Sequence, residues 1–439
     1  MKFLNFINKE NAKDTLSKSL FKAIYANSII VFVKIFSSFI VSKVTAVFLG
    51  PSGYALVGNF KNVIQGVLGV TTTGFESGVI KYVSENKTNK DKLVLILANI
   101  FFLNLILCIA VFIVLFYFSD SISLYTLKTI DYAYVFKYLA ILLPLLSFNF
   151  ICLYIANGLQ KIKIYTILVC VFNLLNGLVV FCLVYYYNLK GALLSSLIVP
   201  SVSFFTVFFF REIRELIFCA FKSINNISVV ILKNMSTYIF MSIYSALLLS
   251  FNYLFIRNAI IENLNINMAG YWEALNKISM FYMMFFSSLF TLYLLPKLTT
   301  NKTTLGYKNI MLSYFKVIIP LMGLAFFLLF IFKYNVIELF LTKDFLPIAN
   351  YFYLQLVADF IKVIAFSFAY QFHAKKITTY YLISDTVLYV SFYFLSINFL
   401  PKFELFGVLY GYLISIILYL IAVCLFLFVF RKNKLSNHE

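Results

Sequence analysis

Apolar residues fill this chain in long runs that short polar stretches separate. A helix of about 20 apolar residues crosses a bilayer core about 30 Å thick. Only helices and closed barrels satisfy their backbone hydrogen bonds in lipid, and a barrel would show alternating segments of about ten residues. The pattern therefore predicts an all-α integral membrane protein. Its twelve predicted spans are 20–48, 55–82, 93–118, 133–157, 164–187, 191–210, 234–256, 269–296, 309–332, 346–372, 377–398 and 404–430.

Composition supports this class. The chain of 439 residues is 62% hydrophobic and 12% charged, whereas soluble domains carry about 25% charged residues. Residues 1–18 lack the apolar core and cleavage site of a signal peptide, so we expect the first span to insert uncleaved. The longest loop, 211–233, has about 23 residues, which leaves no room for an extramembrane domain. The six cysteines form no CxxC pair, and we expect neither a metal site nor a cofactor.

The lysines and arginines predict the orientation. With the N-terminus inside, the cytoplasmic segments hold 22 of them and the opposite segments hold eight, Arg257 among the eight. Cytoplasmic loops carry the excess of Lys and Arg, so both termini are predicted to be cytoplasmic. The net charge of +19 then reflects these loops, and nucleic acid is not an expected partner.

The two halves of the sequence resemble each other at a nearly constant offset. "GYALVGN" at Gly53 corresponds to "GYWEALN" at Gly270, a shift of 217, and "KGALL" at Gly191 corresponds to "FGVLY" at Gly407, a shift of 216. We interpret this as a parallel duplication of six helices, with an N-terminal lobe at 1–222 and a C-terminal lobe at 223–439. A pseudo-twofold axis would then run along the membrane normal, with substrate between the lobes.

Six lysines lie inside predicted spans, and three are candidates for a cationic cavity. A charge at the bilayer centre costs roughly 2.5–3.5 kcal/mol, so it usually faces water or a partner. Lys34 lies near the middle of the first span, about 20 Å from either end, which is too far to reach the headgroups easily. Lys61 and Lys277 occupy corresponding stretches of the second and eighth spans, and either snorkelling or substrate binding would explain them.

Acidic residues inside the spans are candidates for coupling or gating. Asp359 and Lys362 are three residues apart in the tenth span, hence on one helix face, where they either neutralise each other or form a gate. Asp385 lies in the eleventh span, and Glu76 in the second lies in the glycine-rich "TTTGFESG". We expect Glu273, near the outer edge, to be solvated. Surplus lysine suits an anionic group such as phosphate or pyrophosphate.

Enzyme chemistry has little support in the sequence. The two histidines lie in the C-terminal tail and at a helix end, and no metal-ligand cluster, phosphate loop or nucleophile motif is present. An ATP-driven pump would need a nucleotide-binding domain, for which the short loops leave no space. An ion gradient or the substrate gradient would therefore supply the energy.

The first two spans carry a more specific signal. "VKIFSSFIVSKVTAVFLGPSGYALVGNFKNVI", followed by "GFESGVIKYVSEN", resembles the start of the Wzx family, the O-antigen and lipid III translocases of the multidrug/oligosaccharidyl-lipid/polysaccharide (MOP) exporter superfamily. The matching features are Lys34 and Lys43, the "LGPSGYAL" turn, the "NFKN" with Lys61, and "GVIKYV". The detailed match covers residues 31–86, and twelve spans in two lobes agree with the superfamily over the whole chain.

The resemblance implies a flippase for an undecaprenyl-pyrophosphate-linked oligosaccharide in the bacterial inner membrane. It also implies alternating access, proton or sodium antiport, contacts with membrane lipids, and polysaccharide polymerase machinery as a partner. Lys34, and less directly Lys61, carry over as cationic cavity residues. Two alternatives remain: a cation-coupled multidrug exporter of the same superfamily, which surplus lysine disfavours, and a membrane polysaccharide polymerase or ligase, which the short outer loops disfavour.

Overall fold

The computed structural model describes residues 2–72, 75–224, 228–290, 294, 298, 304–374 and 377–436. All regular structure in these ranges is helical, which confirms the predicted all-α class. The helices of the first half are α1 (Lys2–Thr71), α2 (Glu76–Asn86), α3 (Lys90–Tyr117), α4 (Ser119–Leu127), α5 (Ala133–Gly158), α6 (Ile162–Ser203), η2 (Phe204–Phe209) and α7 (Arg211–Lys222). Those of the second half are α8 (Val229–Asn263), α9 (Ile266–Leu289), α11 (Thr304–Ile331), α12 (Lys333–Phe340), η4 (Lys343–Asn350), α13 (Phe352–Ala374) and α14 (Thr378–Ser436).

Eight helical stretches of the described chain are long and apolar enough to cross a membrane. Three of them, in α1, α6 and α14, run for 45, 48 and 52 residues, about twice the length that one crossing needs. Each of these helices is broken at a residue with non-helical backbone angles, namely Gly50, Asn188 and Glu404. The predicted loops near 49–54, 188–190 and 399–403 are therefore reduced to single-residue turns.

Two of these turns share one geometry. Asn188 has a φ of 47° and Glu404 has a φ of 52°, a left-handed region that residues other than glycine rarely adopt. A glycine follows each turn, because a Cβ on Gly191 or Gly407 would lie 1.8 Å or 2.3 Å from a carbonyl oxygen of the preceding helix. Both pairs are 216 residues apart, which is the offset of the sequence repeat.

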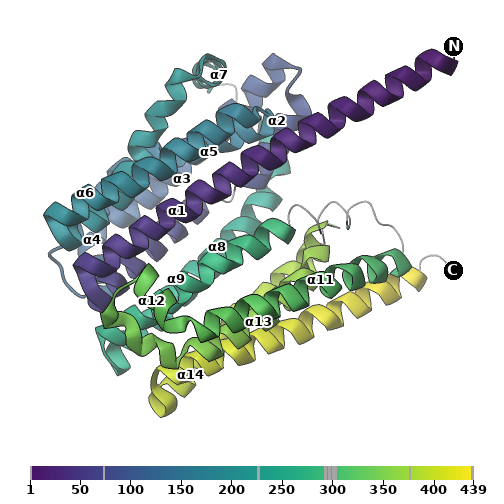
Figure 1. The fold of residues 1–439 in the computed structure, drawn as a ribbon. Helices are drawn as coiled ribbons and strands as arrows, with labels where there is room; N and C mark the ends of the chain where they lie inside the picture. The colour runs from purple at the N-terminus through teal and green to yellow at the C-terminus, as the bar shows by residue number, and fades with distance from the viewer. Residues whose placement is uncertain are drawn as a thin grey trace.

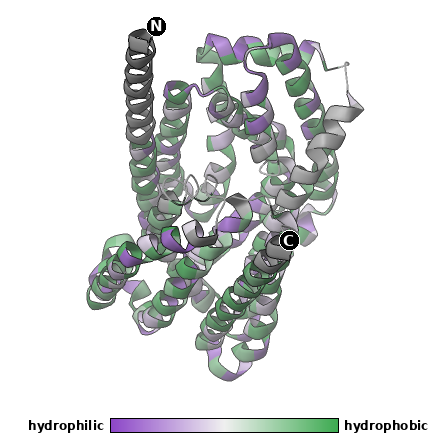
Figure 2. Cartoon of the chain, turned by 90° about the vertical axis from the view of Figure 1, so that its right-hand side faces the viewer, coloured by the Kyte–Doolittle hydropathy of each residue, from purple (hydrophilic) through white to green (hydrophobic). Residues whose placement is uncertain are grey.

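Figure 1 shows the helices of the two halves as two groups, with α1 lying along the boundary between them. α1 packs against α6 of its own half and against α8 and α9 of the second half. The start of α1 and the end of α14 lie at the same side of the molecule (right in Figure 1), and α4 and α12 lie at the opposite side. Apolar residues occupy most of the length of the helices (Figure 2), as lipid-facing segments require.

The segment 211–233, predicted to be a loop, contains the amphipathic helix α7. α7 buries Ile213 and Ile217 against α3 and α5, and its charged residues face outward. Arg211 donates a hydrogen bond of 2.6 Å to Glu215, and this bond lowers the pKa of the Glu215 carboxyl. The helix is thus an anchored connector, which the sequence does not reveal because no span-length apolar run marks it.

Candidate functional site

A cavity of about 560 Å³ lies between the two halves of the molecule. Its walls come from α1, α5 and α6 of the first half and from α8, α9, α13 and α14 of the second. Three lysines line it: Lys61 of α1, Lys277 of α9 and Lys362 of α13. The structure therefore brings together two lysines predicted to bind substrate and one predicted to act as a gate.

The lysines of the cavity have few anionic neighbours. The ammonium groups of Lys61 and Lys277 repel each other. Lys362 Nζ donates a hydrogen bond of 2.9 Å to the hydroxyl of Tyr412 and lies 5.6 Å from the ring centroid of Phe366. Glu273 is the acidic residue of the cavity lining, and Arg257 already pairs with it. The cavity thus has an excess of positive charge, which an anionic ligand would balance.

Asp359 lies directly behind this wall with an exposed fraction of 0%. Four side-chain groups donate hydrogen bonds to its carboxylate. A buried carboxylate needs such donors, because buried polar groups are almost always hydrogen-bonded and an ionised carboxylate only accepts. The donors are Ser279 Oγ at 2.5 Å, Tyr282 OH at 2.5 Å, Gln355 Nε2 at 3.0 Å and Tyr412 OH at 2.8 Å.

Mutual neutralisation of Asp359 and Lys362, and a gate formed by this pair, both stay predictions, and their side chains do not meet directly. Among the described residues, these two form no ion pair at 4.0 Å or less. The hydroxyl of Tyr412 lies between them instead, because it donates to Asp359 and accepts from Lys362. Sequence spacing places both residues on one face of α13 but cannot show which residue of α14 lies between their side chains.

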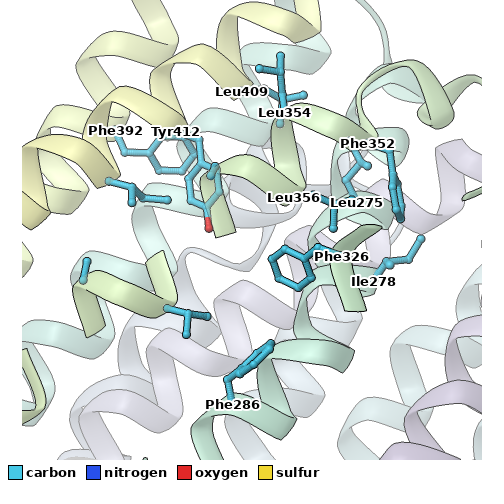
Figure 3. Close-up of a cluster of buried hydrophobic side chains, with 14 of the residues drawn as sticks. Leu275, Ile278, Phe286, Phe326, Phe352, Leu354, Leu356, Phe392, Leu409 and Tyr412 are labelled. Atoms are coloured by element: carbon cyan, nitrogen blue, oxygen red, sulfur yellow. The ribbon is translucent and has the colours of Figure 1, made fainter. Parts of the chain in front are cut away.

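Apolar and aromatic side chains surround this carboxylate site. Tyr412 packs against Phe392 of α14, with ring centroids 5.3 Å apart, and Figure 3 shows the two side chains next to each other. Phe326 of α11 packs against Tyr282 at 5.0 Å between centroids and lies beside the α9 side chains drawn in the same view (Figure 3). Since water is excluded here, the hydrogen bonds to Asp359 are electrostatically stronger than they would be in water.

Two predicted acidic residues lie elsewhere. Asp385 is buried in α14 and accepts hydrogen bonds from Ser245, at 3.2 Å, and from Tyr381. Glu76 begins α2, and its side chain is exposed. Neither residue lines the cavity.

Lys34 is not among the residues that line the cavity. Its side chain is exposed and is attracted electrostatically by Glu76. It lies one helical turn before Ser38, on the α1 face that carries the cavity-lining residues Ser38 and Val41, since positions four and seven apart share a face. Lys34 thus lies one turn beyond the cavity lining, toward the start of α1.

Arg257 and Glu273 form a pair that the sequence does not reveal. Arg257, counted among the outer charges, is 1% exposed inside α8, and its guanidinium lies 5.4 Å from the Trp272 ring centroid. Glu273, expected to be solvated, has a side chain 18% exposed and pairs with Arg257. This pair fits against α1 because residue 58 is glycine: a Cβ there would lie 2.9 Å from the Glu273 carboxyl carbon.

A hydrogen-bonded clamp joins the two halves beside this pair. Asn59 of α1 accepts from Arg257 Nη1 at 2.9 Å and donates to Asn258 Oδ1 at 3.0 Å. The same amide donates to the carbonyl of Thr126 in α4 at 2.8 Å, and Asn258 donates to the carbonyl of Tyr125 at 3.1 Å. We name these residues the Asn59 clamp. No sequence pattern marks the clamp, although Asn59 ends the repeated segment "GYALVGN".

Two lysines join the halves close to the clamp. Lys43 of α1 donates to the carbonyls of Glu338 and Leu341 at the end of α12, at 2.6 Å and 2.5 Å, where the helix dipole favours a cation. Lys128 at the end of α4 pairs with Glu262 of α8 at 2.9 Å. These contacts lie at the side opposite the start of α1 (Figure 1), so the cavity is closed at that side.

The chain shares its fold with solved transporter structures. Among solved structures, an inward-facing multidrug resistance MATE family transporter of the MOP superfamily matches with a TM-score of 0.69 and 15% identity over 94% of this chain and 98% of that chain. The lipid II flippase MurJ, in an inward closed conformation, matches with a TM-score of 0.69 and 15% identity over 93% of this chain and 87% of that chain.

Two curated relatives are named lipid III flippases. The lipid III flippase of Escherichia coli K12 is 23% identical over 424 residues, which are 94% of this chain and all of the relative, and that of Shigella flexneri matches equally. No protein-family model matches the chain. The resemblance to the Wzx-type O-antigen and lipid III flippases, predicted from the first two spans, is confirmed by these lipid III flippase relatives.

Proposed function

We propose that this protein is a flippase that moves a pyrophosphate-linked, lipid-anchored oligosaccharide across the membrane. The observation that carries the proposal is the cavity between the halves, which gathers Lys61, Lys277 and Lys362 inside an apolar protein. Cations inside the membrane-spanning part of a protein are costly and are usually functional. The relatives named lipid III flippases support the same substrate class.

The cavity offers each part of such a substrate a suitable environment. The lysines provide compact point charges for a pyrophosphate. Amide side chains can donate hydrogen bonds to sugar hydroxyls and accept them. The cavity lining includes four such residues, Asn62, Gln65, Asn176 and Asn276. The prenyl tail would remain in lipid beside the apolar outer faces of the helices.

We infer that transport proceeds by alternating access between two lobes, 1–222 and 223–439, with twelve crossings and a pseudo-twofold axis along the membrane normal. The Asn59 clamp, Lys43 and Lys128 close one side in the present conformation, so opening there requires these contacts to break. In the bacterial inner membrane, with both termini cytoplasmic, the closed side would be the outer side. Polysaccharide polymerase machinery would receive the product.

Coupling to H⁺ or Na⁺ would use the buried carboxylates. Asp359 and Asp385 are enclosed by hydroxyl donors in the second half, and such groups can exchange a proton or a small cation. Glu76 and Lys34 attract each other. Lys34 lies near the start of the cavity-lining face of α1, so the two residues would respond to cargo that enters the cavity there. We assign these groups to coupling and gating, and the three cavity lysines to the cargo.

The test is complementation of bacterial strains that each lack one known flippase, scored by surface glycan. We expect rescue of at least one lipid-linked oligosaccharide flippase strain, and loss of rescue in Lys61→Gln and Lys277→Gln. Lys316→Gln is the matched control, because Lys316 is an exposed lysine of α11 outside the cavity. Rescue of no flippase strain by a well-expressed wild-type protein would overturn the proposal.

The second candidate is a cation-coupled multidrug exporter, because the MATE transporter fold matches this chain as well as the MurJ fold does. The lysines of the cavity would repel the cationic drugs that such exporters usually carry. Drug resistance conferred by the wild-type protein, without any glycan rescue, would favour this candidate.

A further inference from the structure

One tyrosine connects the cavity to the buried carboxylate behind it. Tyr412 and Lys362 line the cavity, whereas Asp359 does not. The hydroxyl of Tyr412 accepts from Lys362 Nζ at 2.9 Å and donates to Asp359 Oδ1 at 2.8 Å. The chain of hydrogen bonds therefore runs from the cavity, through one phenol, to a carboxylate that is 0% exposed.

The direction of these bonds is fixed by chemistry. A lysine ammonium only donates, an ionised carboxylate only accepts, and a phenol has one proton to donate. As long as Asp359 is ionised, the Tyr412 proton points toward it, and the oxygen lone pairs remain available to Lys362. The negative charge of Asp359 thereby holds the lysine against the wall through Tyr412.

Neutralising Asp359 would reverse this arrangement. A proton or cation on the carboxylate removes the acceptor of the Tyr412 hydroxyl and the charge that attracts Lys362. The lysine would then face the cavity with its full charge, and the Tyr412 proton could be donated to an anion there. Because coupling between two ligands is reciprocal, an anion bound in the cavity would in turn favour the neutral form of Asp359.

We propose that Tyr412 is the positioning residue that couples the ionic state of Asp359 to the binding of a phosphate-bearing anion by Lys362. The inference rests on the proposed function of the cavity and adds the route by which the ion site and the cargo site communicate. Asp385 is not part of this route, since its hydrogen bonds go to Ser245 and Tyr381.

Ser279 and Tyr253 also line the cavity, but among the described residues neither is seen to bond to Lys362 as Tyr412 does. From α9, Ser279 and Tyr282 donate to it, and from α13, Gln355 does so. Tyr253 of α8 interacts with it electrostatically. Lys362 is the cation that faces it, and the part of the chain described by the structure shows a hydrogen bond from this lysine to Tyr412 alone among these groups.

Tyr282 provides a matched control. Tyr282→Phe and Tyr412→Phe each remove one hydroxyl that donates to Asp359, but only Tyr412 also accepts from Lys362. The purified full-length protein is titrated with inorganic pyrophosphate at pH 6 and pH 8, with and without Na⁺. Comparing variants with wild type at each condition cancels the titration of pyrophosphate itself.

For wild type, we expect the affinity to be higher when Asp359 is neutralised, by roughly fivefold or more, the lower end of usual coupling between sites. Tyr412→Phe should lose this dependence on pH or Na⁺ while still binding pyrophosphate, and Tyr282→Phe should retain it. Lys362→Gln, introduced into wild type or into Tyr282→Phe, should abolish the dependence of affinity on pH or Na⁺, because the cation that responds to the charge of Asp359 is gone.

The outcomes separate the inference from the proposed function. Two results would overturn the role of Tyr412 while leaving a lysine-based anion site. One is wild-type binding that is independent of both pH and Na⁺. The other is an equal dependence on pH or Na⁺ in Tyr412→Phe and in wild type. Absence of pyrophosphate binding by a wild-type protein that rescues a flippase strain would also overturn it, and would leave the flippase assignment in place. Thermal unfolding of each variant checks that the fold is intact.

Discussion

The Asn59 clamp allows a quantitative prediction about opening of the closed side. Asn59→Ala removes the acceptor of Arg257 and the donor to Asn258, two hydrogen bonds that cross from the first half to the second. It also removes the bond from Asn59 to Thr126, which stays within the first half. That third bond is lost in the closed and open conformations alike, so it does not change their ratio.

The magnitude follows from the two bonds that cross the boundary. A hydrogen bond to a charged group contributes about 1.5–3 kcal/mol, and one between neutral groups about 0.5–1.5 kcal/mol. Their loss therefore disfavours the closed conformation by roughly 2–4.5 kcal/mol relative to the open one. Since about 1.4 kcal/mol corresponds to a factor of ten, the ratio of open to closed molecules should rise roughly 30- to 1,500-fold.

The assay is thiol labelling of the cavity from the closed side. The six native cysteines are all free and are first replaced by serine. Gln65→Cys then introduces a probe, because Gln65 is an exposed residue of the cavity lining. A membrane-impermeant maleimide added at the outer side of cells or vesicles should react much faster in the Asn59→Ala background than in the parent.

Two controls make the result specific. Asn263→Ala removes an exposed amide that bonds to Ala259 of its own helix, and it should leave the labelling rate unchanged. Lys128→Ala removes an ion pair between the halves whose side chains are 29% and 62% exposed, and exposed pairs contribute only about 0–1 kcal/mol. Equal labelling rates in folded Asn59→Ala protein and in the parent would refute the reasoning.

Further predictions concern the turns, the cationic residues and the ion site. Gly191→Ala and Gly407→Ala should each lower the thermal stability of the purified protein, because the added Cβ would lie 1.8 Å or 2.3 Å from a carbonyl oxygen; overpacking costs about 1–3 kcal/mol or more. Lys34→Ala should abolish surface glycan in the complementation assay, while Lys34→Arg keeps part of it; full glycan with the alanine variant would remove Lys34 from the site. Lys277→Gln should weaken pyrophosphate binding at least tenfold, as loss of a charged contact of about 1.5–3 kcal/mol implies. Asp359→Asn should make transport in vesicles independent of pH and Na⁺, and an unchanged profile would leave Asp359 a structural carboxylate.

Part of the candidate site was predictable from single residues. Lys61 and Lys277 stood out because a lysine inside an apolar run needs a wet or anionic partner, and both line the cavity. The same reasoning did not reveal that Arg257 and Glu273, which were treated as outer charges, pair with each other. Distance from the end of a span does not reveal a partner on another helix.

Other members of the site carried no sequence signal. Tyr412 is one of 32 tyrosines, and its importance arises from lying between Lys362 and Asp359. The hydroxyls of Ser279 and Tyr282 resemble many others inside the spans, and they matter because α9 packs against α13 at the level of Asp359. Lys34 drew attention by its depth, yet it lies one turn away from the cavity lining.

The sequence by itself determined the membrane class, the helical structure, the positions of most spans and the presence of costly cations within them. These properties follow from local chemistry: a backbone in lipid must bond within its own segment, and apolar length sets what can cross. Only the tertiary structure decided that α1 lies between the halves, that three lysines meet in one cavity, and that Tyr412 and Asn59 link groups far apart in the chain. Such juxtapositions depend on how helices pack, and helix packing in lipid is governed by close contact and polar bonds that no periodic pattern records.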